Sequence, residues 1–193
     1  MCHPFDVFAT GTDLALFLVK LDEDLASRQR SLGCRCGGRL QIANYPRKSF
    51  GIILTGTVFA IRFSFCCAAC RRRTTPPSVR FFGRRRFHAP VFLLLSAVHG
   101  RLTGACLGEL YDLLGVSERT VRRWRRWWRR EFAASAFWRR TQGWLAPPPP
   151  RDEELPLGLV ARFTRRAGEM MVAALEFLSP LTTTSSSLDV RAA

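Results

Sequence analysis

The chain has 193 residues, a formal net charge of +15 and 47% apolar residues. The apolar fraction excludes an intrinsically disordered chain, and the length predicts one or two small domains with a modest core. Its longest apolar stretch, within residues 91–98, is far shorter than the ~20 residues of a membrane span, and no basic segment followed by an apolar run marks a signal peptide at the start.

The excess positive charge lies in one part of the chain. Residues 25–108 contain 15 of the 30 basic residues and no acidic residue. Such a segment predicts a polyanionic partner, with nucleic acid as the first candidate. Because a GC-rich genome also favours arginine, the positions of the arginines carry more weight than their number. We expect a cytoplasmic, nucleoid-associated protein without contact to a membrane.

The N-terminal segment, residues 1–32, is predicted to form one helix over 14–27, capped by Asp13. Five apolar residues at helical spacing form a stripe on it: Leu14, Phe17, Leu18, Leu21 and Leu25. The other face is acidic because it carries Asp22, Glu23 and Asp24. We expect this helix to pack against the domain that follows.

Residues 33–89 change to a pattern of short strands. One strand is predicted over 40–45 and a stronger one over 57–65, where alternate residues (Phe59, Ile61, Phe63 and Phe65) are large and apolar. Turn-forming residues occupy 44–51, and a break at 74–77 precedes a third predicted strand over 78–82.

Two pairs of cysteines flank the predicted hairpin. Cys34 and Cys36 precede it, and Cys67 and Cys70 follow it. Cytoplasmic thiols stay reduced, which favours metal over disulfides, and two cysteine pairs at turns are typical of a zinc ribbon. We therefore predict one structural zinc held by these four thiolates, with no open coordination position and hence no catalytic role.

Three observations leave alternatives at this zinc site. The first pair is one residue shorter than the usual C-x-x-C spacing, Cys66 is an alternative ligand to Cys67, and His88 is an alternative ligand of another type. Cys2 and Cys106 are not expected to bind metal. The net charge of −2 on four thiolates and zinc is offset by neighbouring arginines, which would also face phosphate: Arg35, Arg39, Arg71, Arg72 and Arg73.

Residues 90–145 are predicted to form a helix-turn-helix domain with helices over 91–99, 104–114 and 118–134. Gly115 allows the positive φ that ends the second helix, and Ser117 caps the third. On the third helix an apolar side (Val121, Trp124, Trp128, Phe132) faces away from a basic side (Arg119, Arg122, Arg123, Arg126, Arg130). Arg125 is the exception to this separation, and Trp127 flanks the basic side.

This arrangement is suited to the major groove of duplex DNA. We expect Ser117, Glu118, Arg119, Arg122 and Arg123 to contact base edges, and Arg126, Arg129 and Arg130 to contact phosphates. Two alternatives remain: an amphipathic helix that is merely solvated, and tryptophans that serve as stacking platforms for single strands.

The C-terminal part begins with a proline-rich linker at 146–154. Within residues 155–181 one helix is predicted over 157–178, which either packs on the helix-turn-helix domain or forms a dimer seam, and residues 182–193 are predicted to be a disordered tail. The predicted fold class is α+β, mainly α: a zinc-ribbon-like hairpin unit, a three-helix unit and a C-terminal helix.

The cysteine pairs, the Cys-Arg-Arg-Arg step at 70–73 and the Leu-Gly-Val-Ser-x-x-Thr-Val segment at 114–121 carry a resemblance. Residues 33–132 resemble the N-terminal DNA-recognition half of bacterial insertion-sequence transposases. That resemblance implies binding to terminal inverted repeats, ahead of a ribonuclease-H-like domain with three metal-binding carboxylates. We expect no such domain here, because the 49 residues after Trp144 offer no strands to position a carboxylate triad.

The leading hypothesis is a sequence-specific duplex-DNA-binding protein of mobile-element type that lacks a catalytic domain. We expect no enzyme, because no cysteine–histidine pair, glycine-rich phosphate loop or carboxylate pair has a usable spacing. The alternatives are a host transcriptional regulator and an RNA- or ribosome-associated zinc-ribbon protein. A homodimer and a separate transposase catalytic subunit are the protein partners considered.

Overall fold

The computed structural model describes residues 11–47, 60–83, 85–98, 103–145, 151, 154–163 and 167–183. Its α-helices are α2 (Gly11–Leu32), α3 (Ala89–Val98), α4 (Gly104–Leu114), α5 (Glu118–Trp127), α6 (Ala136–Thr141), α7 (Leu157–Val160) and α8 (Ala167–Leu178). A π-helical turn, η3 (Trp128–Phe132), continues α5, and short 3-10 turns follow α6 (η4, Gln142–Trp144) and α8 (η6, Ser179–Thr182). In this part of the chain each helix is too short or too polar to cross a membrane.

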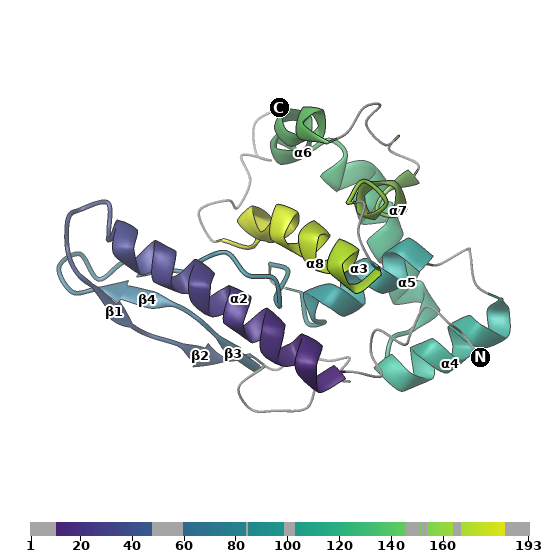
Figure 1. The fold of residues 1–193 in the computed structure, drawn as a ribbon, viewed down its shortest axis with the longest axis horizontal. Coiled ribbons are helices and arrows are strands. Elements are labelled where there is room, and N and C mark those ends of the chain that lie inside the picture. Colours follow the sequence, from purple (N-terminus) through teal and green to yellow (C-terminus); the bar gives the residue numbers. More distant parts are fainter. Residues whose placement is uncertain are drawn as a thin grey trace.

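The strands are short and antiparallel. β1 (Leu40–Ile42), β4 (Phe65–Cys67) and β5 (Arg73–Thr74) form one sheet in the order β1-β4-β5, and β2 (Tyr45–Pro46) pairs with β3 (Ile61–Arg62). Figure 1 shows α2 lying along these strands, with the later helices gathered beyond one end of them. The predicted α+β, mainly α, fold class is confirmed.

The N-terminal helix is longer than predicted. It starts at Gly11 and ends at Leu32, so position 13 lies within the helix and is not its N-cap position. Glu23 and Asp24 are exposed, as expected of an acidic face, but Asp22 is fully buried. The prediction of one continuous acidic face is therefore wrong at Asp22.

Asp22 is buried because it binds a segment distant in the chain. Its carboxylate accepts hydrogen bonds from Ser78 Oγ at 2.5 Å, from the Val79 amide at 2.7 Å and from Arg80 Nε at 2.8 Å. Arg80 is also fully buried and donates to the Ile61 carbonyl at 2.9 Å. A buried charge is tolerated when it is paired and hydrogen-bonded in this way.

The same contacts explain why the strand predictions were partly wrong. Residues 78–82 form a bend with one isolated bridge, Phe81 to His88, because the Val79 amide binds Asp22 and is not available to a ladder. The third strand of the sheet is β5 instead. The predicted strand 40–45 divides into β1 and β2, and 57–65 contains β3 and the start of β4, with 57–59 outside the described residues.

The alternation predicted over 57–65 is also wrong. Arg62 and Ser64 were expected on the polar side, yet both side chains are buried, while Ile61 and Phe63 are half-buried. A guanidinium nitrogen of Arg62 donates to the Pro76 carbonyl at 2.6 Å and to the Thr182 carbonyl at 3.4 Å. These contacts satisfy one terminal nitrogen of the buried guanidinium, whereas Arg62 Nη1 is buried without a hydrogen-bond partner among the described residues.

The main hydrophobic core joins the helices. Leu18 of α2, Phe92 of α3, Trp128 of η3 and Leu178 of α8 belong to one buried cluster. The helix predicted over 157–178 is divided into α7 and α8, and α8 packs on α3 and α7, which confirms packing for this element. The proline-rich stretch at 147–150 lies outside the described residues.

The start of the predicted disordered tail is ordered. Thr182 is buried, and its hydroxyl accepts a hydrogen bond from the Ser78 amide at 2.8 Å and donates to the Ser179 carbonyl at 2.7 Å. The prediction is therefore wrong at Thr182 and at Thr183, whose hydroxyl contacts the Pro180 carbonyl. The rest of that tail, residues 184–193, lies outside the described residues.

Candidate metal centre and nucleic-acid interface

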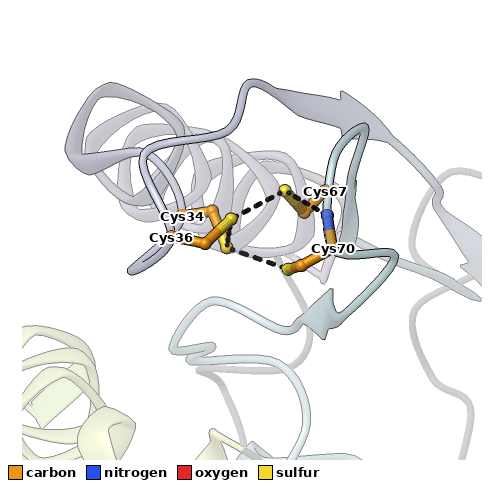
Figure 2. Close-up of side chains that lie close together, drawn as sticks. All are labelled: Cys34, Cys36, Cys67 and Cys70. Atoms are coloured by element: carbon orange, nitrogen blue, oxygen red, sulfur yellow. Dashed lines mark hydrogen bonds between the residues drawn. The ribbon is translucent and has the colours of Figure 1, made fainter.

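Four cysteine sulfurs meet where α2 and β4 end. The Sγ atoms of Cys34, Cys36, Cys67 and Cys70 all lie within 4.8 Å of one another. Figure 2 shows the chain of contacts, with Cys34 at 3.5 Å from Cys36 and 3.6 Å from Cys70, and Cys36 at 3.5 Å from Cys67. Zinc–sulfur bonds of about 2.3 Å in a tetrahedron separate the sulfurs by about 3.8 Å, so the four thiols fit one tetrahedral metal ion.

The short first pair is possible because two glycines follow it. Gly37 adopts a φ of 80°, and its amide donates to the Cys34 carbonyl at 2.8 Å to close a tight turn. At Gly38 an added Cβ would lie 2.6 Å from Cys67 Sγ and 3.3 Å from Cys36 Sγ. Glycine at this position lets the two turns approach closely enough for their sulfurs to meet.

The second pair lies on a turn that points backbone amides at sulfur. The Cys70 amide donates to Cys67 Sγ at 3.5 Å, and Arg71 closes the turn with a φ of 59°. The Cys70 amide first, and then the Ala69 amide, lower the pKa of the Cys67 thiol to about 6. A thiol that ionises near neutral pH is prepared for metal binding.

The two alternative ligands stand apart from this cluster. Cys66 Sγ contacts the Arg71 carbonyl at 3.5 Å, so Cys67 is the member of the cluster, as predicted. His88 is buried, with its ring 5.5 Å from that of Phe81, and burial lowers its pKa to about 4. Cys106 lies buried in α4, as expected, but it is disulfide-bonded, so the expectation that this cysteine stays a reduced thiol is wrong.

The helix-turn-helix has the predicted capping residues. Gly115 ends α4 with φ 60° and ψ 35°, and the Val116 amide donates to the Tyr111 carbonyl at 2.9 Å. Val116 is buried in the junction. Ser117 Oγ then accepts from the Thr120 amide at 3.3 Å and caps the N-terminus of α5.

The inner side of α5 and η3 is an aromatic wall. Val121, Trp124, Trp128 and Phe132 are all buried, as predicted. The ring of Phe92 on α3 lies 5.2 Å from Trp124 and 5.3 Å from Trp128, which fixes α5 against α3. The predicted helix 118–134 becomes π-helical at Trp128, and α6 then begins at a Ser135 cap that the sequence analysis missed.

The outer side of α5 and η3 is basic and exposed. Exposed side chains include every residue predicted to contact DNA: Ser117, Glu118, Arg119, Arg122, Arg123, Arg126, Arg129 and Arg130. Glu118 and Arg122 form an ion pair with a separation of 2.7 Å. Arg125, the predicted exception, is half-buried, and burial lowers its pKa.

Trp127 lies differently from its predicted position beside the basic side. It is half-buried in the aromatic core, with its ring 5.7 Å from that of Phe92 and 5.1 Å from that of Trp128. The guanidinium of Arg85 covers it, with Cζ 4.4 Å from the ring centroid. The sequence analysis missed Arg85, although the run of arginines at 84–86 beside Phe87 was the available signal.

Comparison with known proteins supports the helical part of this site. A family model described as a homeodomain-like domain matches residues 84–135, somewhat over a quarter of the chain, and this range contains α3, α4, α5 and η3. No curated protein and no solved structure gives a match. The chain therefore carries a homeodomain-like helix-turn-helix domain, a type that points to DNA binding, beside a cluster of four cysteines.

Proposed function

We propose that this protein binds duplex DNA in a sequence-specific way by inserting α5 into the major groove. The observation that carries the proposal is the separation on α5 between buried indole rings and exposed guanidinium groups. In homeodomains the third helix enters the major groove, and α5 holds the corresponding place in the matched region. Together α5 and η3 extend about 22 Å at 1.5 Å per residue, long enough to follow the groove.

The proposal divides the exposed residues between two roles. Near the N-terminus of α5, Arg119 and Arg123 pair with guanine edges, and Glu118 accepts from cytosine. Arg126, Arg129 and Arg130 bind phosphates, which supplies affinity and its salt dependence. When α5 meets the bases, the Glu118–Arg122 ion pair must either open or contact the DNA with both groups together. The free-energy cost of this change would affect the recognition of one base pair in the target.

We further propose that the cysteine cluster holds one structural zinc. The support is the donor set: four thiols at distances that match a tetrahedral ion. Four thiolates leave no open position on zinc, so the ion would stabilise the turns and take no part in a reaction. A hollow of about 780 Å³ beside the cluster is lined by Arg35, Arg72 and Arg73, which are suited to phosphate.

We further propose that the protein is of mobile-element type and acts by binding DNA rather than by catalysis. The resemblance of the cysteine pairs and the 114–121 segment to insertion-sequence transposases supports this choice. A target that matches the end of a mobile element would favour it. A short palindrome near a promoter would favour a host regulator, and a preference for structured RNA over duplex DNA at matched salt would favour an RNA-associated protein.

Selection of bound duplexes from a random pool tests the core of the proposal. We expect the wild type to select one sequence, and Arg119→Ala or Arg123→Ala to relax the preference at single positions by about 1–3 kcal/mol. Arg139→Ala is the matched control, because Arg139 is equally exposed but lies on α6. If the two α5 variants select the same sequence as strictly as the control, the assignment of base contacts is refuted.

A further inference from the structure

A pocket of about 620 Å³ opens beside α5. It lies between residues 82–83 and 85–87, the helical run of α5 and η3, and Leu181 of η6. Its size falls within the range of small-molecule sites in proteins. We call it the Arg85 pocket.

The walls of the Arg85 pocket are aromatic. Phe82, Phe87, Trp124, Trp127 and Phe132 line it, and the last three come from the α5–η3 face. Phe87 and Trp127 line the pocket and are only half-buried, although the Arg85 guanidinium covers one face of the Trp127 ring. Accessible aromatic rings in a concave site favour a planar ligand that can stack.

The charged groups of the pocket are mainly cationic. Arg85, Arg86 and Arg123 line it, against a single carboxylate, Glu131. The guanidinium of Arg85 rests on the rings of Phe92 and Trp127, at 4.3 and 4.4 Å from their centroids. Among the described residues no hydrogen bond or ion pair of this guanidinium is found, so its N–H donors remain for a ligand.

The surroundings of Arg85 make an anion the favoured partner. Burial, and then the nearby charge of Arg123, lower the pKa of Arg85 to about 10, which still leaves it protonated at neutral pH. The pocket thus holds three cations against one carboxylate, and two of the cations, Arg85 and Arg123, repel each other while Arg85 is partly removed from water. An anionic ligand would relieve both costs.

We propose that the Arg85 pocket binds one unpaired nucleotide, with its base against the aromatic wall and its phosphate on the arginines. A nucleotide joins the two features that the pocket recognises, a planar ring and an anion, whereas an acidic peptide offers only the second. Two sources can supply it: a free mononucleotide, or an unpaired nucleotide at the end of a DNA duplex. The second source rests on the proposed function, because Arg123 lines the pocket and also lies on the exposed side of α5.

Binding measurements with the full chain separate these sources. The probes are deoxyadenosine monophosphate, a blunt duplex, the same duplex with a short single-stranded overhang, and that overhang with abasic sites. We expect the overhang to raise the affinity about tenfold over the blunt duplex, and the abasic overhang to give no gain, because stacking of one base contributes about 1–3 kcal/mol. An equal gain from the abasic overhang would overturn the proposal, since only phosphate would then be bound.

Substitutions in the pocket test whether it is the source of the gain in affinity that the overhang gives. Arg85→Gln should remove the difference between overhang and blunt duplex, whereas the control Arg139→Gln should keep it. Should Arg85→Gln fail to fold by circular dichroism, Arg86→Gln supplies the test, because Arg86 is exposed. A tenfold gain that survives in the pocket variants overturns the proposal.

The outcomes also distinguish this proposal from the proposed function. If the protein binds none of the duplexes, the proposal that α5 recognises duplex DNA is refuted. The mononucleotide titration alone then tests whether the pocket binds a nucleotide. Mononucleotide binding that quenches tryptophan fluorescence in the wild type and is lost in Arg85→Gln supports the site. Absence of both mononucleotide binding and an overhang gain overturns it, as would a polyglutamate peptide that competes as well as the overhang.

Discussion

The buried ion pair between Asp22 and Arg80 gives the sharpest test of the fold. In Asp22→Asn the shape is kept, and Oδ1 can still accept from the Val79 amide at 2.7 Å. At the other position an amide nitrogen would face Arg80 Nε, a second donor, at a distance that is now 2.8 Å. The substitution therefore leaves a fully buried guanidinium without its counter-charge.

The expected cost of Asp22→Asn is large. Two charge-assisted hydrogen bonds, from Arg80 and Ser78, are lost or inverted, at roughly 1.5–3 kcal/mol each. Breaking a buried ion pair by removing one partner costs about 3–5 kcal/mol in other proteins, which agrees with that sum. We therefore expect the free energy of unfolding to fall by about 3–5 kcal/mol.

Urea unfolding followed by tryptophan fluorescence measures this change. With an m-value of about 2 kcal/mol per molar urea, the midpoint should fall by about 2 M. Asp24→Asn is the matched control, because Asp24 is exposed on the same helix and should change stability by less than about 0.5 kcal/mol. A midpoint for Asp22→Asn equal to that of the control would refute the energetic importance of the pair. In a double-mutant cycle, Asp22→Asn with Arg80→Met should cost less than the sum of the single changes.

Three further predictions concern single positions. Gly115→Ala should lower the free energy of unfolding by about 1–2 kcal/mol, because Gly115 has a φ of 60°, whereas Gly108→Ala inside α4, where an added Cβ meets open space, should not destabilise the protein. The purified protein should contain one zinc per chain by atomic emission, and Gly38→Ala should reduce that content, since a Cβ there would collide with Cys67 Sγ; full zinc content in the variant would contradict the packing argument. Burial holds the pKa of His88 at about 4, below the ordinary value of 6.5, so the unfolded chain binds the proton more readily and stability should fall as pH drops from about 6.5 to 4; His88→Gln should flatten that part of the pH profile, and an unchanged profile would exclude His88 as its source.

Local signals explain the parts of the fold that could be predicted. The bounds of α4 agree with the prediction because Thr103 caps one end and Gly115 ends the other. The two sides of α5 follow from helical periodicity alone, which needs no knowledge of distant residues. The π-helical turn at Trp128 has no comparable local signal in the sequence.

Distant partners explain the parts that could not be predicted. Asp22 looked like a surface acid because its partner, Arg80, is 58 residues away. Arg62 looked like the polar residue of an alternating strand, but one of its acceptors, the Thr182 carbonyl, is 120 residues away. The charge pattern showed that residues 25–108 lack acidic side chains. It could not show that two arginines of this segment, Arg62 and Arg80, are buried and structural.

The candidate site, too, has parts that could be predicted from the sequence and parts that could not. The cysteine cluster was predictable because two short spacings bring four thiols to two turns. The need for glycine at position 38 was not, because it depends on how closely the two turns approach. The Arg85 pocket was missed because its rings come from two separate segments, the one before α3 and the α5–η3 run, and because its guanidinium also rests on Phe92 of α3.

The position of α2 explains how the cysteine cluster and the helix-turn-helix are joined. Ala26 belongs to a small cluster with Leu40, Phe65 and Cys67, while Leu18, two turns earlier on the same helix, belongs to the main core. Four buried residues supply little hydrophobic stabilisation on their own, so the small cluster depends on what holds its cysteines. Asp22 lies between these two contacts on α2 and fixes the segment that leads into α3. The orientation of the cysteine cluster is thus linked to the helix-turn-helix through one helix and one buried ion pair, which relates the arginines beside the cysteines to those on the exposed side of α5.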